Sequence, residues 1–285
     1  MSLLGWMSLF VEYVHAAEPV HRDLVYQTIG DADLKLDIYH PQKAETKWPV
    51  IIWVHGGAWK SGSKSDVPIS GMLEHGFSIV SVDYRLSTVA KFPAQARDIH
   101  VAIRYVKHHS EKYSLDRDRF IIAGASAGGH LAALVGLTAG NEELAGGVPT
   151  ASRDTSEVQG IVSFFGASNL ESILTQSTPF GLTVRVPALE LLLGGQPENL
   201  PELAKLASPT SHVGKRSPPL WLYHGDQDPQ MPIQQSYELD RKYREFGLTS
   251  KLRVIPGGKH GGREFFSDEL LGQLASELKR TLTEK

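Results

Sequence analysis

The chain has 285 residues, 41% hydrophobic and 21% charged, an ordinary globular mixture that is long enough for one large α/β domain. It contains no cysteine, which excludes disulfides, thiolate metal sites and a cysteine nucleophile. The formal net charge is −3 and both signs are scattered along the chain, so nucleic acid is not expected as a partner.

Residues 1–17 form a mostly apolar segment that ends in Val14-His15-Ala16-Ala17. Small residues at this end are typical of a signal-peptidase site, whereas the lack of Lys and Arg at the start and the interruption by Glu12 are not. Either a signal peptide makes the protein periplasmic or secreted, or the segment is an N-terminal tail of a cytoplasmic protein. The segment is too short and too polar to cross a bilayer, and no later stretch reaches that length, so no integral membrane segment is expected.

Strands and helices are predicted to alternate through most of the chain. Residues 34–39 alternate apolar and polar side chains, which favours an edge strand with one solvated face. Later apolar runs are continuous, as in parallel strands buried on both faces, at 49–54, 79–82, 120–123, 161–165, 220–223 and 251–255. Helical patterns occupy 94–113, 128–137, 234–246 and 268–282. The sequence therefore predicts an α/β fold, a mostly parallel, doubly wound sheet with helices on both faces and functional sites at the carboxyl ends of strands.

Residues 166–218 break this alternation, with scattered proline and glycine and one apolar cluster at 189–193. Because the stretch is too long for a plain loop, we expect a small helical excursion over the carboxyl edge of the sheet. We expect it to belong to a single catalytic domain at 18–285. Trp59, Phe165 and the 189–193 cluster are candidates for lining a pocket, although core packing explains each equally well.

Ser126 is the candidate nucleophile. It lies in Gly124-Ala125-Ser126-Ala127-Gly128, between a predicted strand and a predicted helix. A serine on such a strained turn needs small neighbours, and its oxygen then sits at the N-terminus of the helix, where developing negative charge is favoured.

His55-Gly56-Gly57-Ala58-Trp59 follows the predicted strand 49–54. Backbone amides in a glycine-rich loop can stabilise the oxyanion of a tetrahedral intermediate. We expect these donors to be the amides of Gly57 and Ala58, together with that of Ala127 after the serine. His55 is interpreted as bracing this loop rather than as a base.

The expected chain order of nucleophile, acid and histidine is satisfied downstream of Ser126. His224-Gly225-Asp226-Gln227-Asp228 follows one predicted strand, and His260 follows the last one. The two aspartates compete for the acid role, and Asp226 could instead brace its loop by accepting backbone amides. Other histidines, including His130, are not placed to act on the serine. No His and carboxylate cluster has metal-ligand spacing, so neither metal nor cofactor is expected.

Together these motifs resemble the α/β-hydrolase carboxylesterases, in particular the bacterial bifunctional carbohydrate/feruloyl esterases (BD-FAE-like) and the hormone-sensitive-lipase-related group. The similarity covers about residues 25–280. It implies that Asp228 is the catalytic acid, that Ser126 and His260 complete the triad, and that the cap is small or absent. Ala58 departs from the lipase-type third glycine and matches a His-Gly-Gly-x-Trp branch shared with formamidases.

The predicted function is therefore a serine carboxylic-ester hydrolase that acts through an acyl-enzyme on small-molecule esters, either short acyl, acetyl or feruloyl. A kynurenine formamidase-like aryl formamide hydrolase is the alternative. A hydrolase-fold binding protein without turnover is disfavoured, because the serine, acid and histidine are all present. The sequence does not predict the oligomeric state.

Overall fold

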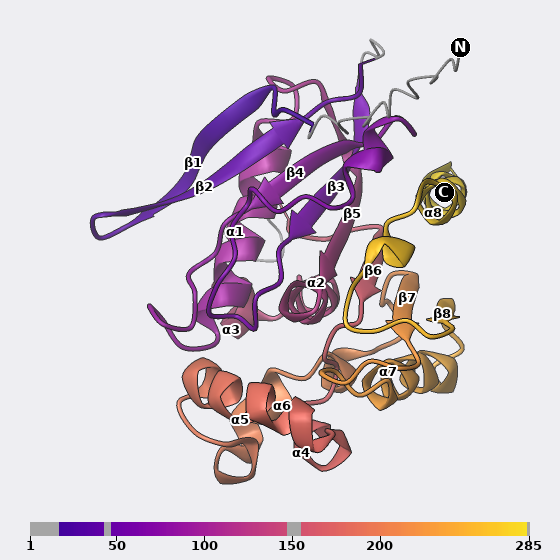
Figure 1. Ribbon diagram of the computed structural model, residues 1–285. Coiled ribbons are helices and arrows are strands. Elements are labelled where there is room, and N and C mark those ends of the chain that lie inside the picture. Colours follow the sequence, from indigo (N-terminus) through magenta and orange to yellow (C-terminus); the bar gives the residue numbers. More distant parts are fainter. Residues whose placement is uncertain (1–16, 43–46, 147–154, 284–285) are drawn as a thin grey trace, which may run out of the picture.

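The computed structural model describes residues 17–42, 47–146 and 155–283 (Figure 1). The signal peptide or tail expected at residues 1–17 lies outside these ranges, except for Ala17. Over the described residues, no helix combines the length and apolar character needed to cross a membrane.

The described strands form one eight-stranded sheet in the order β1-β2-β4-β3-β5-β6-β7-β8. From β4 to β8 neighbouring strands are parallel, whereas β2 is antiparallel to both β1 and β4. This confirms the predicted mostly parallel sheet. The strands are β1 (His21–Ile29), β2 (Ala32–Tyr39), β3 (Trp48–Val54), β4 (Ser78–Val82), β5 (Leu115–Ala125), β6 (Gly160–Phe164), β7 (Leu220–Gly225) and β8 (Ser250–Ile255).

Helices cover both faces of the sheet, as predicted. Along β3, Val50 and Ile52 belong to the core that the sheet shares with α1, α2 and α7, whereas Ile51 and Trp53 belong to the core that it shares with α8. This division follows from the alternation of side chains along a strand. The α-helices are α1 (Ala94–His108), α2 (Ala127–Leu137), α3 (Glu142–Ala145), α4 (Ile173–Gln176), α5 (Pro179–Leu193), α6 (Pro201–Leu206), α7 (Gln234–Glu245) and α8 (Asp268–Thr283).

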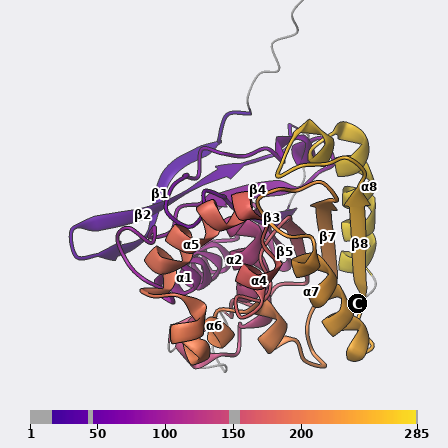
Figure 2. The same cartoon turned by 60° about the horizontal axis from the view of Figure 1, so that its bottom comes forward.

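The excursion at residues 166–218 forms α4, α5 and α6, with one short 3-10 turn before α6 and another after it. These helices lie together beyond the carboxyl ends of the central strands (Figures 1 and 2). Leu189, Leu192 and Leu193 of α5 are buried in the core, so this apolar cluster anchors the excursion and is not part of the lining of the pocket at Ser126. Trp59 is also fully buried in the core.

The prediction that residues 34–39 form an edge strand is wrong. These residues belong to β2, which lies between β1 and β4, and β1 is the outer strand. The mixed sequence of β1 gave no clear alternation, and the polar residue Asp37 of β2 is buried rather than solvated. Lys64 Nζ lies 2.8 Å from both carboxylate oxygens of Asp37 and 2.9 Å from Asp23 Oδ1. A charge partner 27 residues away therefore replaces the expected solvent.

Removing this partner tests the buried ion pair. Lys64→Met would leave the Asp37 carboxylate buried without its counter-charge, so we expect the free energy of unfolding to fall by about 3 to 5 kcal/mol. Urea denaturation measures this change. Lys279→Met, an exposed lysine on α8, is the matched control and should change stability by less than about 0.5 kcal/mol. A similarly small loss in Lys64→Met would show that the pair is not needed.

Candidate active site

Ser126 occupies the sharp turn between β5 and α2, with φ 56° and ψ −118°. Its amide donates to Phe164 O at 2.9 Å, which ties the turn to the neighbouring strand. A Cβ at Gly124 would lie 2.3 Å from Gly128 O, and one at Gly128 would lie 2.0 Å from Val54 O. The small neighbours expected around the serine are therefore required by close approach of three backbone segments.

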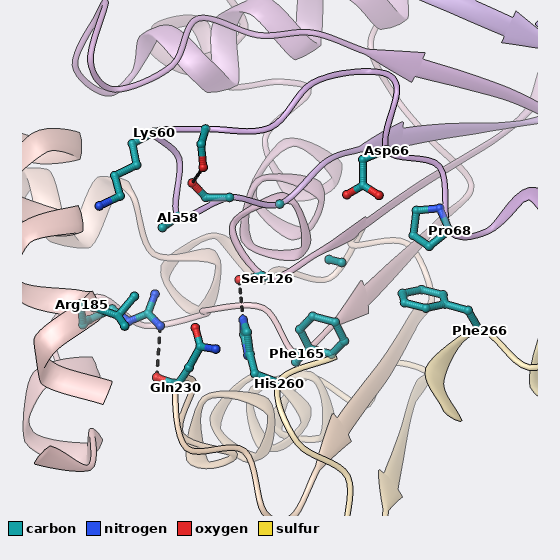
Figure 3. Close-up of a pocket in the computed structure, with 15 residues that line it drawn as sticks. Ala58, Lys60, Asp66, Pro68, Ser126, Phe165, Arg185, Gln230, His260 and Phe266 are labelled. Atoms are coloured by element: carbon teal, nitrogen blue, oxygen red, sulfur yellow. Dashed lines mark hydrogen bonds between the residues drawn. The ribbon is translucent and has the colours of Figure 1, made fainter. Parts of the chain in front are cut away.

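The structure brings Ser126, His260 and Asp228 together, although 134 residues separate the first two in the chain. His260 Nε2 lies 2.8 Å from Ser126 Oγ, and His260 Nδ1 lies 2.7 Å from Asp228 Oδ2 (Figure 3 shows the first contact). A carboxylate can only accept, so Nδ1 carries the proton and Nε2 accepts the serine hydroxyl. Asp228 and His260 follow β7 and β8, so adjacent strand ends place them beside the turn after β5.

Asp228 is held as a carboxylate by the loop around it. Its Oδ1 accepts the amides of Gln230 at 2.8 Å and Met231 at 2.9 Å. Burial alone would raise the pKa of Asp228, but the N–H groups of His224, His260 and Met231 hold this pKa well below its usual range. The site therefore keeps a negative charge beside the His260 ring.

Asp226 braces its loop by accepting a backbone amide, which was the alternative to the acid role. Its side chain is exposed, and its Oδ1 accepts the amide of Gly257 at 2.7 Å, which joins the loops after β7 and β8. Of the two aspartates, Asp228 is the one that contacts His260.

His224 is a site residue that the sequence reasoning missed. It is fully buried, and its Nε2 donates to Met231 O at 3.0 Å while lying 3.4 Å from Asp228 Oδ2. Its Nδ1 accepts the hydroxyl of Ser236 at 2.7 Å. The histidine thus fixes the loop that carries the carboxylate. Its position four residues before Asp228 was the available signal.

The loop after β3 faces Ser126. Gly57 and Ala58 line the same pocket as the serine, with φ values of 104° and 51°. Their amides donate to no other group in the described part of the chain. Ala127 begins α2, so its amide has no partner within that helix.

His55 braces this loop, as interpreted from the sequence. It is buried, stacks on Tyr84 with 4.4 Å between ring centroids, and contacts Gly56 O at 2.8 Å through Nδ1. Burial lowers the pKa of His55 below its usual value, which keeps the ring neutral at neutral pH.

Trp59 and His130 link the same loop to the helical excursion. Trp59 Nε1 donates to His130 Nδ1 at 3.0 Å, and His130 Nε2 donates to Ala207 O at 2.7 Å. Burial lowers the pKa of His130 to about 4, so the ring is neutral and can carry both bonds. Both side chains are fully buried, which makes this connection structural.

The pocket at Ser126 has a volume of about 480 Å³. Figure 3 shows two different sides around the serine. Phe165, Phe266 and Pro68 form an apolar side, and Phe165 also packs edge-on against the His260 ring at 4.9 Å. Lys60 and Arg185 lie on the other side. In the described ranges no group of three or more His, Asp or Glu residues is placed to hold a metal ion.

The mostly parallel sheet and the strand–serine–helix turn define an α/β-hydrolase. A family model described as BD-FAE matches residues 36–243, and the chain belongs to this family. Esterase LipC of Mycobacterium tuberculosis is 33% identical over 251 residues, which are 85% of this chain and 60% of LipC. Esterase LipQ of the same organism is 34% identical over 84% of this chain and 56% of LipQ. The chain thus spans little more than half the length of these relatives.

Solved structures agree with this assignment. A truncated form of a carbohydrate esterase from gut microbiota has a TM-score of 0.82 and 28% identity, covering 92% of this chain and 96% of that one. A bifunctional GH43-CE protein of Bacteroides eggerthii has a TM-score of 0.81 and 30% identity, covering 92% and 35%. The expected resemblance to α/β-hydrolase esterases is therefore confirmed.

The lowered pKa of Asp228 predicts a contribution to stability that depends on pH. Because the folded pKa lies below the unfolded value of about 4, this contribution is present above pH 4 and is lost as the pH falls towards the folded pKa. Asp228→Asn should therefore lose less unfolding free energy than the wild type between pH 5 and pH 3. Urea denaturation across this range measures the slopes. Ser126→Ala keeps the carboxylate and should retain the wild-type slope, and an equally steep slope in Asp228→Asn would contradict the assignment.

Proposed function

We propose that this chain is a serine carboxylesterase in which Ser126, His260 and Asp228 form the catalytic triad. The observation that carries the proposal is the continuous hydrogen-bond chain from Asp228 through His260 to a serine on a strained turn that lines a pocket. The names of the relatives support ester hydrolysis, because LipC and LipQ are both called esterases.

In the proposed reaction, Ser126 Oγ attacks the ester carbonyl while its proton passes to His260 Nε2. The Asp228 carboxylate orients the ring and stabilises the imidazolium that forms. The negative oxygen of the tetrahedral intermediate is held by the amides of Gly57, Ala58 and Ala127. Its collapse releases the alcohol, which takes the proton from His260, and leaves an acyl-serine. Water, deprotonated by His260, then attacks this ester, and the acid leaves as Ser126 regains its proton.

The pocket favours small esters with one planar or short apolar part. Phe165 and Phe266 can pack against an aromatic acyl group such as feruloyl or against an aryl alcohol. The carbohydrate esterase among the structural neighbours supports an acetylated or feruloylated sugar as substrate. A panel of acetyl-sugar, feruloyl, short acyl and aryl formamide substrates separates these classes.

Ser126→Ala is the direct test of the nucleophile. The variant removes the attacking oxygen, so kcat for 4-nitrophenyl acetate should fall by at least about a thousandfold. Ser276→Ala, an exposed serine on α8, is the matched control and should retain wild-type kinetics. In the wild type, an active-site-directed phosphonate should add its mass to the peptide that contains Ser126. Near wild-type hydrolysis by Ser126→Ala would refute the assignment.

The two aspartates can be separated by the same assay. Asp228→Asn should lower kcat by about a thousandfold or more, because the amide no longer stabilises the imidazolium. Asp226→Asn keeps the His260–Asp228 contact, and its kcat should stay within about tenfold of wild type. A larger loss in Asp226→Asn than in Asp228→Asn would reassign the acid.

A further inference from the structure

Arg185 is a buried cation in the wall of the Ser126 pocket. It lies on α5, its relative exposure is 2%, and its guanidinium is turned towards the side where Ser126 and His260 lie (Figure 3). One terminal nitrogen donates to Gln230 O at 3.1 Å, and the guanidinium lies 5.8 Å from the centre of the Trp59 ring.

No carboxylate contacts this guanidinium among the described residues. Arg185 forms no ion pair there, and its buried Nε has no hydrogen-bond partner. The contrast with Arg85 is direct, because Asp98 accepts from Arg85 Nε at 2.8 Å and from a terminal nitrogen at 2.7 Å. The nearby Asp228 carboxylate is already bound to His260.

A buried cation that forms no ion pair is costly to maintain. Burial lowers the pKa of Arg185 to about 10, and the Asp228 charge works against this shift. The guanidinium is therefore still protonated at neutral pH, and it lines the pocket with more donors than the one that binds Gln230 O. A carboxylate is the group whose geometry fits these donors best.

We propose that the pocket takes esters that carry a carboxylate, and that Arg185 binds this carboxylate while Ser126 attacks the ester. This proposal rests on the serine esterase function proposed above. Lys60 lies on the same side of the pocket and adds a second, exposed positive charge. Asp66 lies on the opposite side, beside Pro68, so the charges orient an anionic substrate with its apolar part against the aromatic rings.

Matched ester pairs test this preference. In the first pair, 4-nitrophenyl hydrogen glutarate carries a carboxylate on its acyl chain, and 4-nitrophenyl pentanoate is its neutral counterpart. The pair 3-acetoxybenzoate and 3-acetoxytoluene places the carboxylate on the alcohol side. The wild type should show a higher kcat/KM for the charged member of at least one pair, and that pair identifies the side that faces Arg185.

Substitution of Arg185 should remove the preference. Arg185→Met should lower kcat/KM for the charged ester by about 10- to 100-fold and leave the neutral ester within about threefold. Arg185→Lys, which keeps the charge without the planar fork, should give an intermediate loss. Arg241→Met is the matched control, because this arginine lies on α7 with its side chain 75% exposed and does not line the pocket. It should retain the wild-type preference.

Binding gives a readout that does not need turnover. Calorimetry measures the binding of 3-hydroxybenzoate or glutarate to two variants, Ser126→Ala alone and Ser126→Ala combined with Arg185→Met. The single variant should bind the carboxylate at least about tenfold more tightly than the double variant. Loss of turnover for all esters alike in Arg185→Met would make the residue structural and overturn the proposal. So would equal kcat/KM values within both pairs in a wild type that hydrolyses neutral esters through Ser126. Hydrolysis that survives Ser126→Ala would instead refute the esterase mechanism itself.

Discussion

The backbone of Ser126 is held at a positive φ, and the rest of the site depends on this turn. A non-glycine residue in that region costs on the order of 1 to 3 kcal/mol, so the surrounding structure must enforce it. Here the enforcement comes from the Phe164 carbonyl, which accepts the Ser126 amide, and from Gly128, whose Cα lies against the Val54 carbonyl. The close pairing of β3, β5 and β6 therefore stabilises the turn at Ser126. This turn places the serine oxygen next to His260.

Much of the candidate site could be predicted because parallel strands deliver their carboxyl ends to one edge of the sheet. Ser126, Asp228 and His260 each follow a strand directly, so locating the strands was enough to bring the three residues together. The loop at residues 55–59, proposed to stabilise the oxyanion, follows the same rule after β3. In these segments the local pattern and the tertiary arrangement agree, since the buried strands are continuously apolar and the loops after them are rich in glycine.

Two features that the sequence left unsettled depend on partners far away in the chain. Asp37 alternates with apolar residues in the sequence, and this pattern predicted a solvated side chain. The pattern contained no sign of its buried partner Lys64. Trp59 was a candidate for either the pocket wall or the core; it is fully buried, and its indole donates to His130, 71 residues on. A periodic pattern shows which face of an element is apolar, but it does not show which polar group will compensate a charge that is buried there.

Trp59 also connects the two parts of the pocket that matter for the proposed chemistry. Its neighbour Ala58 lines the pocket together with Ser126, and the Trp59 ring lies beneath the guanidinium of Arg185. His130 fixes the indole from α2, the helix that begins directly after Ser126. Core leucines hold α5 in place, so Arg185 stands on a packed element rather than on a free lid. The buried Trp59 ring thus connects Arg185, which we propose selects the substrate, to the loop that we propose stabilises the oxyanion. This connection keeps both at fixed positions relative to the serine.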